Sequence, residues 1–388
     1  MSEGIHVRSA PTGSAARPDF RVLAKPEVDV PDVPNAEELP ALDGERASRN
    51  LRRGLISLLI LVALVVGLVL AVPGLHGVGS EVAKMQGGWI AAAIVLEVLS
   101  CLAYVLAFLQ VFERAPIRFG ARVALSELAF GTAVSLGGAG SVAVGAWLLI
   151  DRGAKPRRVA ERSAVLFLIT SAVNVITLAL TGLALFVGIL PGPRSLLLSA
   201  VPAAVGIAVL AFFLSLPWLS KLGAAKLAPG RIRTLLTMTD ESVRATRDLL
   251  LKPDWRIVGA FAYLWCDIAV LAACFAASGH APPLTVIVLA YQIGYLSNVI
   301  PIPGGIGVLD GSMVGMLVLY GVAATPAAAA TLVYHAIALW IPAMWGSVAF
   351  LVLRRTRHQP ITPRPTLAHR RRLRADRRNR PDPPKPAT

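Results

Sequence analysis

Residues 163–190 read SAVLFLITSAVNVITLALTGLALFVGIL, a run of 28 residues without a charged side chain. A helix needs roughly 20 such residues to cross a bilayer core about 30 Å thick. Residues 55–72 form a second run of this kind, with no charge across 18 residues. A soluble core would show amphipathic periodicity instead of uncharged blocks. The two runs therefore predict helices that span a membrane.

The composition of the whole chain agrees with this class. Of the 388 residues, 55% are hydrophobic and 16% are charged, whereas soluble domains carry about 25% charged residues. The formal net charge is +15, but residues 354–388 alone supply +10, from twelve Arg and Lys against two Asp. A polybasic stretch beside a membrane helix is typical of a topology signal and of contact with anionic lipids. We therefore expect no nucleic-acid partner.

Signatures of soluble enzymes and metal sites are missing from the sequence. The three cysteines lie in apolar segments, without metal or redox spacing, and are Cys101, Cys266 and Cys274. Buried cysteine usually packs as a small hydrophobic residue. The chain contains no Walker loop, no metal-binding His/Glu spacing and no nucleophile elbow. We expect no enzymatic activity, no cofactor and no metal.

The pattern divides the chain into three parts. Residues 1–45 are rich in Pro, Ala, Asp and Glu and predict a disordered acidic tail. Residues 46–355 form the membrane domain, and 356–388 form a basic disordered tail. Within the domain, halves at 51–217 and 256–353 are joined by a cytoplasmic amphipathic linker at 218–255. About six spanning helices are expected, at 55–72, 89–112, 163–190, 196–217, 256–277 and 327–353.

Basic residues predict the direction of each segment, because they remain on the cytoplasmic side. They place both termini in the cytoplasm, and the loop at 74–88 outside. Segment 123–150 has basic clusters on both flanks, which one spanning helix cannot satisfy. A re-entrant hairpin that turns at Gly137, Gly138, Ala139 and Gly140 satisfies both flanks.

Segment 284–320 contains the same Gly-Gly-x-Gly pattern, 167 residues further on, at Gly304, Gly305 and Gly307. The charges allow this segment to be either a second hairpin, entered from outside, or two full spans. Two hairpins entered from opposite faces would form an inverted repeat, with sites near the membrane midplane. The sequence thus predicts an all-α polytopic membrane protein with two glycine-turn re-entrant hairpins.

Each hairpin would start a second half-helix near the midplane, at about Ser141 and about Leu309. A helix N-terminus presents free N–H groups and roughly half a positive charge, which suits a phosphate. Glycine also lets the backbone approach a bulky head group. The other interpretation is that these glycines only permit tight helix packing.

Polar residues within the apolar segments are the remaining candidates for a binding site. Glu127 lies on the first arm of the first hairpin, where it would line the site or carry a proton. Asp310 would either bind a head group or cap its own half-helix. His335 would pair with Asp310 or bond across helices. Asn298, Pro301 and Pro303 would shape the second turn, whereas Glu97 and Asp267 are expected at bundle contacts.

The run Asn298–Asp310, NVIPIPGGIGVLD, resembles the hallmark of a flippase-like family that includes the membrane domain of lysylphosphatidylglycerol synthases. The family pattern is Pro-x-Pro-Gly-Gly-x-Gly followed by an acid, usually Glu. The resemblance covers about residues 50–355 and is strongest at 291–350. This chain departs from the pattern with Asp310 in place of Glu and His335 in place of a common Arg. The first hairpin carries no charge between 135 and 145.

The resemblance implies a lipid translocase in the bacterial cytoplasmic (inner) membrane. Its substrate would be an anionic phospholipid or a polyprenyl-phosphate-type lipid. The chain would lack the aminoacyl-transferase domain of the synthases and would not make lysyl-lipid. Two alternatives remain open: an ion-coupled carrier of a small polar solute that uses Glu127, and a non-transporting scaffold for cell-envelope enzymes.

Overall fold

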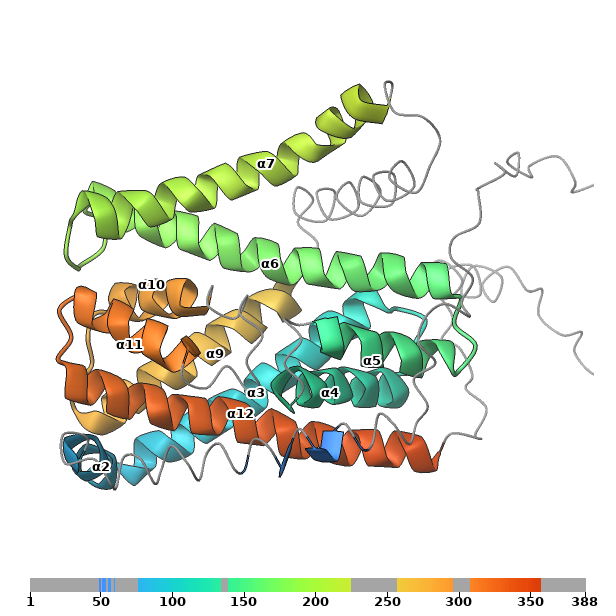
Figure 1. Ribbon diagram of the computed structural model, residues 1–388, viewed down its shortest axis with the longest axis horizontal. Helices are drawn as coiled ribbons and strands as arrows, with labels where there is room; N and C mark the ends of the chain where they lie inside the picture. The colour runs from blue at the N-terminus through green and yellow to red at the C-terminus, as the bar shows by residue number, and fades with distance from the viewer. Residues whose placement is uncertain are drawn as a thin grey trace, which may run out of the picture. The chain divides into compact units, whose positions relative to one another are not determined.

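Long apolar helices dominate the chain in the computed structural model (Figure 1). Five of the described helices are long and apolar enough to cross a membrane. The prediction of an all-α polytopic membrane protein is therefore confirmed. The structure describes residues 49, 51–53, 55, 56, 59, 76–133, 139–224, 257–295 and 308–356.

The five candidate spans agree with five of the predicted segments. They are α3 (Gly87–Val111), α6 (Pro156–Val187), the unit formed by η2 (Leu196–Ala200) and α7 (Val201–Ala224), α9 (Ile257–Ser278) and α12 (Ala324–Arg355). Most of the predicted first span at 55–72, most of the glycine turns and most of the linker at 218–255 lie outside the described residues. The tails at 1–45 and, apart from Thr356, at 356–388 also lie outside them.

Shorter helices fill the rest of the described bundle. They are α2 (His76–Ala83), α4 (Ile117–Ala133), α5 (Ala139–Ile150), α10 (Leu284–Tyr295) and α11 (Val308–Leu319). At 1.5 Å per residue, a helix of 12 residues such as α5, α10 or α11 is about 18 Å long, too short for a 30 Å core. Helix α2 was not predicted, because the segment 74–88 is short and rich in glycine. It packs against α12, and this packing stabilises a helix that its own sequence does not strongly favour.

The closest packing in the bundle joins α3 to α9 and α4 to α12. Across the α3–α9 interface, Ser100 donates a hydrogen bond of 3.2 Å to the Tyr263 carbonyl. The rings of Tyr104 and Tyr263 lie 5.2 Å apart, centroid to centroid. Helix α12 contacts α11 along one part of its length and α4 along another, so it connects the two sets of short helices (Figure 1).

One end of the bundle collects segments that the charges place in the cytoplasm. Arg152, which follows α5, donates to the carbonyl oxygens of Leu353 at 3.2 Å and Thr356 at 2.9 Å. Its guanidinium also lies 5.4 Å from the ring centroid of Phe119, near the start of α4. Arg162 donates to the carbonyl of Val111, the last residue of α3, at 3.3 Å. These contacts bring the start of α4 and the end of α5 to the same end of the bundle.

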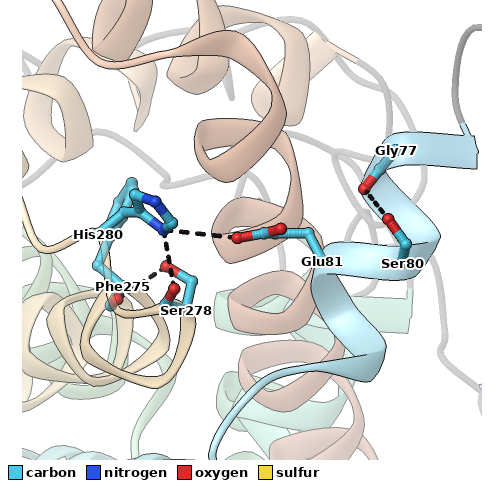
Figure 2. A network of polar contacts seen from close by, with 6 residues as sticks. All are labelled: Gly77, Ser80, Glu81, Phe275, Ser278 and His280. Atoms are coloured by element: carbon cyan, nitrogen blue, oxygen red, sulfur yellow. Dashed lines mark hydrogen bonds and ion pairs between the residues drawn. The ribbon is translucent and has the colours of Figure 1, made fainter.

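Segments predicted to lie outside meet at the other end. Figure 2 shows Glu81 of α2 beside His280, which follows α9, with 3.4 Å between the carboxylate oxygen and the ring nitrogen. The Gln86 amide also donates to the Ala277 carbonyl at 3.0 Å. Tyr320, just after α11, donates to the Leu198 carbonyl at 2.7 Å. The pair α4–α5 and the pair α10–α11 therefore open toward opposite ends of the bundle, while their entry into a membrane as hairpins stays a prediction.

Arg152 should be a stability determinant at the first of these ends. Replacing it with alanine removes its hydrogen bonds to the carbonyls of Leu353, in the last turn of α12, and of Thr356, just after that helix. We expect a loss of about 1–3 kcal/mol, because the bonds are partly buried and come from a charged donor. Arg157→Ala is the matched control, since its pair with Glu161 is exposed and worth at most about 0.5 kcal/mol. Thermal unfolding in detergent compares them. Equal melting temperatures for Arg152→Ala and Arg157→Ala would show that Arg152 does not stabilise this end of the bundle.

Candidate functional site

Asp267 lies at the centre of a buried polar cluster. It follows the start of α9 by ten residues, which places it about 15 Å inside the helix. Its side chain is 9% exposed, and its Oδ2 accepts hydrogen bonds from two tyrosine hydroxyls. Tyr334 of α12 donates at 3.1 Å, and Tyr291 of α10 is the second donor. One carboxylate thus connects three helices.

Glu97 approaches the same carboxylate from α3. It is 4% exposed, and the two carboxyl groups lie within hydrogen-bonding reach of each other. The Cys101 thiol contacts Glu97 Oε1 at 3.8 Å. Among the described residues, Glu97 Oε2 receives no hydrogen bond from a donor. The cluster therefore contains two acids from two helices in direct contact.

His335 lies next to Tyr334 in α12 and belongs to the surroundings of this cluster. It is 8% exposed and acts electrostatically on Asp267. Its predicted pairing with Asp310 stays a prediction. Asp310 lies in the first turn of α11, as expected, and its side chain is not among those described.

Glu127 is the other predicted residue with a described side chain. It lies in α4, is 3% exposed, and accepts a hydrogen bond of 2.8 Å from the Tyr104 hydroxyl of α3. Its other oxygen faces Gly145 of α5, where an added Cβ would lie 1.6 Å from Oε1. Glu127 therefore lies between both arms of the first helix pair, buried against α3.

The predicted glycine turns lie mostly outside the described residues. This applies to the predicted residues Gly137, Gly138, Asn298, Pro301, Pro303, Gly304, Gly305 and Gly307. Of the first predicted turn, Ala139 and Gly140 belong to helix α5 instead. The helices that follow the turns begin within two residues of the predicted starts, at Ala139 and Val308, so Gly140 falls in the first turn of α5. Ser312 of α11 donates to the Gly294 carbonyl of α10 at 3.1 Å, which holds the two arms together around the second turn.

Metal chemistry has no obvious site in the part of the chain that the structure describes. No group of three or more His, Cys, Asp or Glu side chains there is arranged to hold a metal ion. The buried acids instead take their partners from tyrosine and cysteine.

Comparison with known proteins adds the family. A family model described as the lysylphosphatidylglycerol synthase TM region matches residues 54–346 of the 388. The chain belongs to this family. The matched residues contain both Gly-Gly-x-Gly clusters, all four helices of the two short pairs and the acids Glu97, Glu127 and Asp267. The resemblance drawn from Asn298–Asp310 is thereby confirmed.

A curated relative of the lysylphosphatidylglycerol synthase TM region family is similar over a shorter stretch. It is a UPF0104 membrane protein of Methanothermobacter thermautotrophicus, 32% identical over 97 residues. The match covers 24% of this chain and 28% of the relative. Family membership establishes a multi-pass membrane protein, of the kind that acts among membrane lipids.

Sequence reasoning about this family member missed the tyrosines. Tyr104, Tyr291 and Tyr334 each donate to a buried acid, and none was selected from the sequence. Glu97 and Asp267 were expected at bundle contacts, which is where they lie. Each of two apolar segments contains an acid, Glu97 in one and Asp267 in the other. Because an acid inside a bilayer needs a polar partner, these acids were a signal that polar side chains such as tyrosine lie nearby.

Proposed function

We propose that the protein is a lipid translocase that moves an anionic lipid, or a lipid-linked head group, across the cytoplasmic membrane. The observation that carries the proposal is the pair of short-helix units that open toward opposite ends of one bundle. Broken helices that approach the midplane from both faces are the usual element of a site with alternating access. Irregular backbone at that depth needs protein or water around it, which favours a cavity.

The proposed head-group site lies between the turns that precede α5 and α11. The first turns of both helices would present N–H groups that have no partner within the helix, and such groups suit a phosphate oxygen. Asp310 in α11 would orient a polar or amine-containing part of the head group, and His335 of α12 would contribute from the neighbouring helix. The lipid tails would stay in the bilayer while the head group passes.

Location in the bacterial inner membrane, with both termini cytoplasmic, is part of the same proposal. The end of the bundle that carries Arg152 and Arg162 would face the cytoplasm, and the end with Glu81 and His280 would face outward. Basic residues favour the cytoplasmic side. The basic tail at 356–388 would then contact anionic lipids of the inner leaflet. No cofactor is needed for movement down a gradient.

Lipid movement in proteoliposomes tests the proposal. Short-chain fluorescent phospholipids and a fluorescent polyprenyl-phosphate analogue would be followed with a membrane-impermeant quencher. We expect rapid exchange with wild-type protein, reduced about tenfold or more by Gly305→Leu or Asp310→Asn, equivalent to about 1.4 kcal/mol or more at the barrier. Gly315→Ala is the control, since an added Cβ there meets nothing within 4 Å. Exchange no faster than in empty liposomes, for every lipid, would contradict the proposal.

The two alternatives give different results in related assays. A solute carrier that uses Glu127 would lose its activity in Glu127→Gln, whereas lipid exchange would only weaken. A scaffold would lose its cellular role when residues 1–45 and 356–388 are deleted, whereas a translocase would keep most of its exchange rate. The buried contact between Glu127 and Tyr104 supplies the specific reason to include the first of these tests.

A further inference from the structure

Two acids in contact inside the bundle pose a hydrogen-bonding problem. The carboxyl groups of Glu97 and Asp267 are within hydrogen-bonding reach, yet ionised carboxylates are acceptors only. Glu97 Oε2 is buried, and no donor among the described residues reaches it. A buried acceptor without a donor destabilises the folded protein, and two buried like charges destabilise it further. A single proton between the carboxyl groups removes both effects.

The surroundings of the two acids are unequal, which indicates where the proton lies. Asp267 accepts from two hydroxyls, those of Tyr291 and Tyr334, which stabilise an ionised carboxylate. Within the described part of the chain, the donor to Glu97 is the Cys101 thiol, a weak donor, at 3.8 Å. Glu97 is therefore the group that carries the proton, and Asp267 is the acceptor to which it donates.

The location of the pair connects it to α10, one of the short helices on which the proposed function rests. Glu97 belongs to α3 and Asp267 to α9, while Tyr291 belongs to α10, the first helix of the pair α10–α11. Loss of the proton would place a second negative charge beside Asp267. The repulsion would act directly on the Asp267–Tyr291 hydrogen bond, which joins α9 to α10.

We propose that Glu97 and Asp267 form a proton-binding site at the centre of the bundle, through which lipid movement responds to pH. The response of lipid movement to pH rests on the proposed function, whereas the proton-binding site does not. In the step itself, the O–H bond of Glu97 breaks and its proton leaves to water, so the pair changes from one negative charge to two. No oxidant, reductant or metal takes part.

Other titratable groups surround the Glu97–Asp267 pair, on its own helices α3 and α9 and on the neighbouring helices α10 and α12. Those that interact electrostatically with Glu97 or Asp267 are Cys101 of α3, Tyr263 and Cys266 of α9, Tyr291 and Tyr295 of α10, and Tyr334 and His335 of α12. His335 acts on Asp267 and titrates near neutral pH in its unperturbed state. A His335→Gln variant therefore accompanies the test, to separate its titration from that of the acid pair.

The site is tested first without transport. Infrared spectroscopy of the purified full-length protein in lipid should detect the C=O stretch of a protonated carboxyl group, which disappears as the pH rises. We expect Glu97→Gln to remove one component of this band, with an unchanged or higher melting temperature because the amide replaces the protonated acid. Glu127→Gln, which replaces the other buried acid, should leave that component in place. Asp267→Asn should lower the melting temperature, since it weakens two tyrosine hydrogen bonds. Glu161→Gln, an exposed acid, is the control that should retain the band.

Transport under a pH gradient supplies the second test. In proteoliposomes, we expect the rate of fluorescent phospholipid exchange by wild type to change several-fold when a pH difference is imposed. His335→Gln should exchange lipid more slowly, because His335 belongs to the proposed head-group site, but its rate should change by the same factor. Glu97→Gln should exchange lipid at one rate with or without the gradient.

Each result has a clear meaning. A difference spectrum between wild type and Glu97→Gln that shows no carboxyl band at any pH would overturn the proton site whatever the lipid does. Exchange that ignores the gradient in wild type would overturn the response to pH. Absence of exchange with every lipid would instead contradict the translocase proposal, and the infrared result would still decide whether the pair holds a proton.

Discussion

Gly346→Ala should be the most damaging single-methyl change in the described bundle. The added Cβ would lie 2.0 Å from the carbonyl oxygen of Leu125 and 2.6 Å from the Cβ of Ala129, both in α4. A backbone carbonyl cannot rotate away as a side-chain end can, so α12 and α4 must separate. Overpacking of a close interface costs typically about 1–3 kcal/mol, and we expect the upper end, about 3 kcal/mol. Small residues allow such close approach between membrane helices.

The measurement is thermal unfolding of the purified protein in detergent, with the yield of folded protein as a second readout. Gly315→Ala in α11 is the matched control, because a Cβ there has open space. It should be neutral or stabilising by at most about 1 kcal/mol, the helix-propensity difference between alanine and glycine. A Gly346→Ala protein as stable as the control would show that α12 and α4 do not pack as described.

Gly145→Ala should be nearly as costly, through a different atom. The new Cβ would lie 1.6 Å from Glu127 Oε1 and 2.4 Å from its Cδ. Glu127 cannot swing out freely, because it is buried and its other oxygen accepts from Tyr104. Displacing the carboxyl breaks that bond and leaves a buried polar group unsatisfied, for a loss of about 2–3 kcal/mol. Melting temperature in detergent reports the loss.

A double-mutant cycle identifies the cause. In a Glu127→Ala background the obstructing carboxyl is gone, so Gly145→Ala should then cost less than about 0.5 kcal/mol. The difference between the two backgrounds is the interaction energy of the contact. If Gly145→Ala destabilises equally in both backgrounds, the clash is with something other than Glu127, and the described geometry of α4 and α5 would be wrong.

The spanning helices were predictable because their physical requirement is local. An uncharged run such as 163–190 must be long enough for the bilayer, and the corresponding helix α6 covers Pro156–Val187. The starts of the short helices were predictable for a related reason, since a glycine cluster ends one helix and the next apolar run begins another. Helix α2 was missed because its residues carry little helix preference, and its contacts come from α12.

The buried polar cluster was not predictable from the sequence, because its members are far apart along the chain. Glu97 and Asp267 come from different halves of the protein and meet only when α3 packs on α9. Nothing local distinguishes Tyr291 or Tyr334 from a tyrosine that packs in a core. The resemblance drew attention to the second glycine turn and Asp310, whose roles stay predictions. Glu127 is a buried polar group inside the bundle, with Tyr104 as a partner that the sequence did not indicate, and its role in binding stays a prediction.

The opposite openings of the two short pairs bear on how the chain is threaded during synthesis. The start of α4 and the end of α5 lie at one end, so this pair adds no net crossing. If α10–α11 likewise returns to its starting side, excising residues 284–319 would leave α12 pointing in the same direction. The C-terminus would then keep its side of the bilayer in a chain without the pair. The direction of the spanning helices would thus not depend on the short pairs. A short pair would be acquired or lost without inverting the helices that follow it.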